Sequence, residues 1–194
     1  MRVLWLVIAI LLSAGLLSCE KKEKFNGTLL DRKASEFCLK GWEAGKEKRV
    51  CLSDFRGKVV LMFFGYTHCP DVCPTALQML AKTMKELPKD VREKVQVIFI
   101  SVDPERDTPE IAQKYAKYFY PTFMGLTGTP EEIKKVAKEY MAFYRKVETG
   151  SEGGYLVDHT AYIYLIDPKG TLKLIYPSTK QKPELIAEDV KRFF

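Results

Sequence analysis

The feature that most constrains the fold of this chain is an unbroken apolar run from Val59 to Phe64. A strand that is apolar at every position is buried on both of its faces, which is typical of a sheet covered by helices on each side. A second run, apolar except at Gln96 and Ser101, occupies residues 95–102 and predicts a second buried strand. Between them, residues 75–87 place leucine and methionine at helical spacing and predict an amphipathic helix. The chain is therefore predicted to build an α/β domain around two central strands.

The remainder of the chain continues the alternation of helices and strands. Helix starts are indicated where threonine precedes proline, at Thr108 and Thr129. This order predicts an α/β sandwich of thioredoxin type, with a central mixed sheet flanked by helices and an N-terminal β-hairpin. The polar stretch 141–160 is predicted to be irregular. The other predicted elements are helices over 108–119, 129–140 and 183–194, a short strand over 123–126 and a strand–turn–strand hairpin over 161–176.

Two cysteines follow the first apolar run. Cys69 and Cys73 lie at the predicted junction of strand and helix, and Pro74 occupies a first-turn helix position. A helix N-terminus stabilises a thiolate, which is the form that attacks disulfides and also the form that binds soft metals. Three residues separate the cysteines, one more than is usual in thioredoxin-like redox sites. The longer turn allows the sulfurs to straddle an ion without preventing a disulfide.

A third metal ligand has only two histidine candidates, His68 and His159. A soft Cu(I) ion prefers two thiolates plus an imidazole, whereas Cu(II) accepts nitrogen and sulfur together. His68 precedes Cys69 directly, and neighbours at a strand end point to opposite sides. His159 is remote in sequence. The residues by themselves leave the two histidines equally placed.

The first 18 residues have the order of a secretory signal: Arg2, an apolar run, small residues and then Cys19. The apolar stretch is shorter than the roughly 20 residues that a bilayer-spanning helix requires. Cys19 resembles the lipidated cysteine of bacterial lipoproteins. We therefore predict a signal peptide over 1–18, a lipidated tether over 19–28 and a folded domain over 29–194. The alternative is an uncleaved anchor; both place the domain outside the cytoplasm, on the periplasmic side, tethered to the cell membrane.

Another cysteine pair, Cys38 and Cys51, lies on two short apolar-flanked segments separated by a glycine-containing stretch. Folding this segment into a hairpin brings the two cysteines across from each other. Because free thiols rarely persist in an oxidising compartment, a structural disulfide is predicted. The alternative is two small buried side chains that never bond.

The formal net charge of +6 is spread over a surface of mixed sign. No basic cluster is interleaved with aromatic residues, so no nucleic-acid partner is expected. A mildly positive surface fits docking to an acidic, membrane-bound partner.

Four separated motifs resemble the Sco/SenC family, whose members are thioredoxin-fold copper proteins that assist assembly of the dinuclear copper centre of cytochrome c oxidase. The resemblance runs from about Leu29 to the C-terminus. The motifs are residues 54–58 (DFRGK), 65–74 (GYTHCPDVCP), 101–109 (SVDPERDTP) and 157–160 (VDHT).

The resemblance implies that Cys69, Cys73 and His159 are the copper ligands, and that His68 has a local structural role. Two neighbouring acids, Asp71 and Asp158, are candidates for adjusting the site from outside the ligand set. The resemblance offers no support for the disulfide between Cys38 and Cys51.

The function that this implies is that of a copper-binding metallochaperone rather than an enzyme. Reduced Cys69 and Cys73 would bind Cu(I), and His159 would also permit Cu(II). Copper would pass to the copper-site subunit of cytochrome c oxidase by ligand exchange, and another periplasmic copper carrier is a candidate source of the metal. The alternative is a thiol–disulfide oxidoreductase that reduces the oxidase copper-site cysteines through a redox-active Cys69–Cys73 pair. A third reading is an interaction domain in which that pair forms a stabilising disulfide.

Overall fold

The computed structural model describes residues 24–150 and 154–194. The predicted signal peptide, the predicted lipidation site Cys19 and residues 19–23 of the predicted tether lie outside the described residues. Among the residues described, no helix is both long and apolar enough to cross a bilayer.

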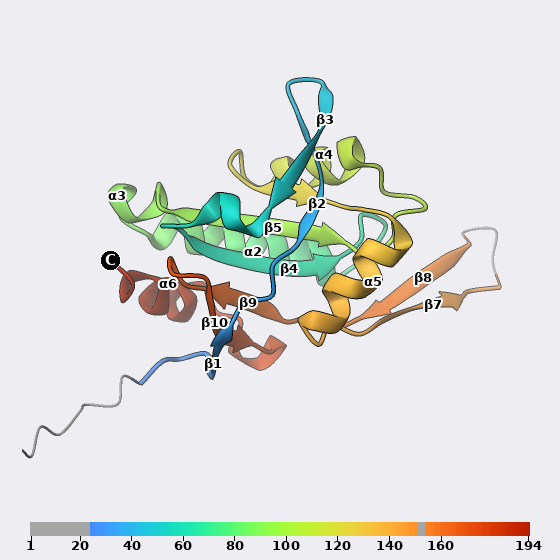
Figure 1. Ribbon diagram of the computed structural model, residues 1–194. Helices are drawn as coiled ribbons and strands as arrows, with labels where there is room; N and C mark the ends of the chain where they lie inside the picture. Colours follow the sequence, from blue (N-terminus) through green and yellow to red (C-terminus); the bar gives the residue numbers. More distant parts are fainter. Residues whose placement is uncertain (1–23, 151–153) are drawn as a thin grey trace, which may run out of the picture.

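A six-stranded mixed sheet forms the centre of the domain, in the order β1-β10-β9-β4-β5-β6 (Figure 1). The apolar run becomes β4, which pairs parallel with β5 and antiparallel with β9 and is buried at every position. The mixed sheet and its flanking helices confirm the predicted α/β sandwich. The strands of this sheet are β1 (Thr28–Lys33), β4 (Val59–Gly65), β5 (Val95–Ser101), β6 (Met124–Leu126), β9 (Ile163–Ile166) and β10 (Thr171–Tyr176).

Helices cover both faces of this sheet. The connections from β4 to β5 through α2, and from β5 to β6 through α4, step the same way along the sheet, so right-handed crossovers place both helices on one face. There α2 contacts both α4 and α6. In Figure 1, α2 lies behind the sheet and α5 in front of it. The helices are α2 (Val72–Glu86), α3 (Lys89–Arg92), α4 (Pro109–Phe119), α5 (Pro130–Glu139) and α6 (Pro183–Lys191), with short 3-10 helices η1 (Leu52–Phe55) and η2 (Ser178–Lys180).

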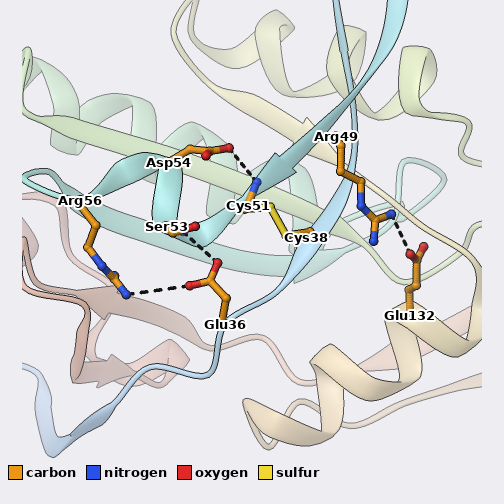
Figure 2. Close-up of a disulfide and its surroundings, with 8 residues drawn as sticks. All are labelled: Glu36, Cys38, Arg49, Cys51, Ser53, Asp54, Arg56 and Glu132. Carbon is orange, nitrogen blue, oxygen red and sulfur yellow. Dashed lines mark hydrogen bonds and ion pairs between the residues drawn. A yellow bond between two sulfur atoms is a disulfide. The ribbon is translucent and has the colours of Figure 1, made fainter.

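The predicted N-terminal hairpin consists of β2 (Cys38–Glu43) and β3 (Lys46–Cys51). Residues 44 and 45 form its two-residue turn with φ of 50° and 79°, the left-handed pair typical of a tight hairpin turn. Cys38 lies directly opposite Cys51, with their Cα atoms 4.0 Å apart, and the predicted disulfide joins them (Figure 2).

One stretch differs from its prediction. Within residues 141–160, predicted to be irregular, the chain forms a second hairpin from β7 (Tyr144–Glu148) and β8 (Tyr155–His159). This hairpin is a separate two-stranded sheet that projects from one end of the domain (Figure 1). Most of its side chains are exposed or half-buried, so the strict alternation that indicates a strand with one buried face is absent.

The chain enters the domain beside α6. The backbone N–H groups of Asn26 and Gly27 both donate to the buried carboxylate of Asp189, at 3.0 and 2.9 Å, and the Tyr176 hydroxyl donates to the same group at 2.9 Å. The strand β1, which the sequence patterns did not predict, then pairs with β10. This entry point lies at the end of the domain opposite the β7–β8 hairpin (Figure 1).

Candidate metal centre

Two neighbouring cysteines and a histidine from a distant part of the chain meet at the carboxyl end of β4. Cys69 lies in the turn that follows β4, Cys73 lies in the first turn of α2, and His159 is the last residue of β8. Their ligand atoms all lie within 4.8 Å of one another. The Cys73 Sγ is 3.2 Å from the His159 Nε2. The structure therefore brings together both cysteines and the more distant of the two candidate histidines.

Cys69 is held as a thiolate by its neighbours. Both cysteines are free thiols, Cys69 half-buried and Cys73 fully buried. A hydrogen bond from the Cys73 thiol lowers the pKa of Cys69 to about 3, against the effect of burial and with help from His159 and the backbone amides of Cys73 and Asp71. The Cys73 N–H lies 3.4 Å from the Cys69 Sγ. Since α2 has no side-chain N-cap, its first amides are available to this sulfur.

Cys73 has the opposite character. Burial raises the pKa of its thiol, and the adjacent Cys69 thiolate adds to that effect. The pair is therefore asymmetric. Cys69 is a half-buried thiolate, able to attack a disulfide or bind a metal, whereas Cys73 is a buried thiol that remains protonated in the metal-free protein. Metal binding would displace this proton, because a coordinating thiol is deprotonated.

Gly65, the last residue of β4, leaves room for this pair. A Cβ built at Gly65 would lie 2.6 Å from the Cys73 Sγ and 3.0 Å from the rings of Phe63 and Phe99. Real side chains do not approach so closely, so glycine is the residue that fits beneath the buried sulfur.

Two aromatic rings and a carbonyl orient His159. The rings of Phe63 and Tyr66 contact its imidazole edge-to-face, with centroids 5.8 and 5.9 Å away. Its Nδ1 lies 3.3 Å from the carbonyl oxygen of Thr160. A carbonyl only accepts hydrogen bonds, so this contact holds the ring when Nδ1 carries a proton, and the Nε2 atom faces Cys73.

The other predicted site residues lie outside the ligand group. His68 is exposed, and its ring contacts the Thr67 hydroxyl at 3.1 Å. Asp158 is paired with Arg145 at 3.0 Å. The Asp71 carboxylate contacts Thr75 at 3.5 Å, so its link to Cys69 runs through its backbone amide.

Sequence reasoning missed the groups that surround His159, namely Phe63, Tyr66 and the Thr160 carbonyl. Phe63 reads as core in a buried strand, and backbone carbonyls carry no sequence signal. Tyr66 and Thr160 do fall inside two of the motifs. Their closeness in sequence to Cys69 and His159 was the one signal that could have indicated a role at the site.

The donor set fits a soft metal. Thiolate sulfur selects Cu(I) and other soft ions, and imidazole adds a ligand that Cu(II) also accepts. Cys73 is buried, whereas Cys69 and His159 line a hollow that Pro70, Val72, Leu156 and Ala161 also border. The fold and the site together define a thioredoxin-like domain with two cysteines and one histidine at its strand–helix junction, placed so that they could hold a metal ion.

Comparison with known proteins places this domain in a family. The SCO1/SenC family model matches residues 37–194, and the chain belongs to that family. It is 41% identical over 143 residues to the mitochondrial SCO2 homolog of Bos taurus, a match that covers 73% of this chain and 53% of the bovine protein. The chain thus spans about half the length of that curated relative.

Solved structures of the family share the fold closely. The apo Sco1 protein of Thermus thermophilus is 42% identical with a TM-score of 0.78, covering 90% of this chain and 99% of that one. ScoI of Bradyrhizobium japonicum, solved with copper bound, is 44% identical with a TM-score of 0.73, covering 84% and 99%.

Two more distant structures bear on what the family does. BsSco, a member of the Sco family of cytochrome c oxidase assembly proteins in which a disulfide switch was identified, is 28% identical with a TM-score of 0.65, covering 86% of this chain and 95% of that one. A SCO1/SenC family lipoprotein of Bacillus anthracis is 28% identical with a TM-score of 0.71, covering 86% and 97%.

Proposed function

We propose that this protein binds copper through Cys69, Cys73 and His159 and passes it to the dinuclear copper site of cytochrome c oxidase. The observation that carries the proposal is the convergence of the three ligand atoms within 4.8 Å, on a chain 44% identical to a protein solved with copper bound. The assembly role of the family member BsSco supports the oxidase as the target.

The site residues divide the work of holding and releasing the metal. The Cys69 thiolate, on the open side, is the group that an incoming thiolate of the target would replace first. Cys73 gives up its proton to bind, and His159 offers Nε2. Two thiolates suit Cu(I), and the imidazole also permits Cu(II). Oxidation of the Cys69 thiolate and the Cys73 thiol to a disulfide releases one proton and two electrons. It removes both sulfur ligands, so copper loading depends on the reduced state.

A thiol–disulfide oxidoreductase is the second candidate, favoured by the asymmetry of the pair. A half-buried thiolate beside a buried thiol is suited to attack a partner's disulfide and then resolve the mixed disulfide. In that reaction Cys69 and Cys73 become a disulfide, and the target's copper-site disulfide takes up two electrons and the Cys73 proton to become one thiolate and one thiol.

One substitution separates the two functions. We expect His159→Ala to weaken Cu(II) binding by more than the 10–100-fold that loss of an outer-shell partner costs, and to change the Cu(II) spectrum. The same variant keeps both thiols and should still reduce a disulfide substrate with copper excluded. Copper titration and an exchange assay measure the two properties.

His68→Ala is the matched control, because it removes the other histidine from outside the ligand group. It should bind copper like the wild type. Unchanged stoichiometry, affinity and spectrum in His159→Ala would contradict the three-ligand site. Wild-type protein that reduces disulfides but binds no copper after purification in the reduced state would favour the oxidoreductase.

We also propose that Cys19 carries a lipid after removal of residues 1–18. The family includes a lipoprotein, and the chain enters the domain at the end opposite the hairpin that carries His159 (Figure 1). A tether at that end leaves the metal centre accessible while raising its concentration near a membrane-bound target. Mass spectrometry of the mature protein should find a lipidated Cys19 at the N-terminus, and Cys19→Ser should release the domain from membranes. An intact segment 1–18 in the mature protein would contradict this.

A further inference from the structure

The hairpin that carries His159 is not part of the central sheet. Its strands β7 and β8 pair only with each other among the described strands, so no ladder of backbone hydrogen bonds joins them to the six-stranded sheet. The imidazole nevertheless has to stay within ligand distance of Cys73, which belongs to α2. Besides the short chain segments that join the hairpin to α5 and β9, the position of His159 therefore depends on contacts between the hairpin and the body of the domain.

The strongest of these contacts form a closed ring at the start of β8. The Arg106 Nε donates to one oxygen of the buried Asp103 carboxylate at 2.5 Å, and its Nη1 donates to the carbonyl oxygen of Tyr155 at 2.9 Å. The Tyr155 hydroxyl donates to the other Asp103 oxygen at 2.7 Å. The Arg106 guanidinium also lies over the Tyr155 ring, 3.7 Å from its centroid. The backbone carbonyl, hydroxyl and ring of Tyr155 thus all contact Arg106 or Asp103.

Arg106 also reaches toward the histidine itself. Its guanidinium lies 5.7 Å from the centroid of the Tyr66 ring, and Tyr66 packs edge-to-face on His159. Burial raises the pKa of Tyr66, and a hydrogen bond with the backbone of Val157, in the middle of β8, acts in the opposite direction. Arg106 therefore contacts both Tyr155, which belongs to the hairpin, and Tyr66, which packs against it.

The same short segment after β5 holds the loop that carries Cys69. The buried Asp107 carboxylate accepts hydrogen bonds from the Thr67 N–H at 2.9 Å and from the Thr67 hydroxyl at 2.5 Å. The Ser101 hydroxyl donates to it at 2.5 Å. Residues 103–107 thus hold the cysteine loop through Asp107 and the histidine hairpin through Arg106, and this common support fixes the two halves of the site relative to each other.

We propose that Arg106 is a positioning residue of the metal centre, which holds the β7–β8 hairpin through Asp103 and Tyr155 so that His159 stays beside Cys73. Its pairing with a buried carboxylate and a backbone carbonyl at once needs the fixed fork of a guanidinium. The effect on copper rests on the proposed function. The effect on the hairpin does not, because it concerns the metal-free protein.

Arg106→Gln is the test, with Arg145→Gln as the matched control. Arg145 lies on the same hairpin and its loss removes the same charge, but it is exposed and pairs only with Asp158 in the described structure. In the metal-free protein, amide hydrogen exchange of residues 144–148 and 155–159 should become at least tenfold faster in Arg106→Gln and stay near wild type in Arg145→Gln. Exchange in β4 and β5 should not change.

Copper provides the second readout. Arg106→Gln should weaken Cu(II) affinity about 10–100-fold, as loss of an outer-shell partner does, and should shift the Cu(II) spectrum toward that of His159→Ala. Tyr155→Phe removes the hydroxyl that donates to Asp103 and should cause smaller changes in the same direction. This variant replaces Arg106→Gln in the test if Arg106→Gln folds poorly.

Several results would overturn the proposal. Hairpin exchange in Arg106→Gln and Tyr155→Phe that matches the control would show that neither residue holds the hairpin. Faster exchange across β4 and β5 as well would make Arg106 a general stabiliser of the fold. Should the wild type bind no copper, the proposed function fails, while the exchange measurement still decides the role of Arg106.

Discussion

At pH 5, iodoacetamide is expected to modify Cys69 and leave Cys73 untouched. The pKa of Cys69 is lowered to about 3, chiefly by the hydrogen bond from the Cys73 thiol, whereas burial raises the pKa of Cys73. The thiolate is the reactive form, so the rate of Cys69 alkylation should stay level from pH 8 to about pH 4. An ordinary thiol with a pKa of about 8.5 slows roughly tenfold per unit over that range, a difference of about a thousandfold between pH 8 and pH 5.

The variant Cys73→Ala tests the cause of this behaviour. It removes the thiol that donates to Cys69, so the pKa of Cys69 should rise and the alkylation rate should regain its dependence on pH. Cys69→Ser should abolish labelling at pH 5. A wild-type rate that falls tenfold per unit from pH 8 downward would show that Cys69 is an ordinary thiol.

Removal of the disulfide between Cys38 and Cys51 is expected to lower the free energy of unfolding by about 3 kcal/mol. The two cysteines are 13 residues apart, and a closed loop of about 15 residues restricts the unfolded chain by about that amount. The hairpin is also held by the buried side chains of Leu39 and Val50 and by two backbone hydrogen bonds between Lys40 and Thr127. The rest of β3 is mostly exposed, and its ion pair from Arg49 to Glu132 of α5 lies at the surface, where such pairs contribute little (Figure 2). For a domain of this size the loss corresponds to a fall in Tm of about 6–12 °C.

The measurement is best made in a Cys69→Ser background, so that Cys38–Cys51 is the one disulfide within the folded domain. Adding Cys38→Ala and Cys51→Ala should lower the denaturation midpoint, and a reductant should lower the parent to nearly the same value. The double variant should not respond to reductant. A change below about 1 kcal/mol would mean that the hairpin is held by its packing rather than by the bond.

Local patterns predicted much of this domain because burial and backbone period leave a direct trace in sequence. The run from Val59 to Phe64 became the central strand, which extends one residue further to Gly65, since a fully buried strand has to be apolar throughout. The helices that begin after Thr108 and Thr129 start where their caps predict, with each hydroxyl accepting a hydrogen bond from the third amide of its helix. The β7–β8 hairpin left no such trace because neither of its faces is fully buried.

For the metal centre, the sequence by itself determined that Cys69 and Cys73 lie at the same strand–helix junction. With only three residues between them, the two cysteines cannot lie far apart in space. The residue pattern did not decide whether His68 or His159 is the third ligand. The resemblance to the family implied His159. Only the tertiary structure brings His159 within 3.2 Å of Cys73 across 86 residues of chain. That approach depends on a hairpin outside the main sheet and on contacts from the half-buried Arg106 and the buried Tyr66. These contacts are set by the path of the whole backbone and not by any local period.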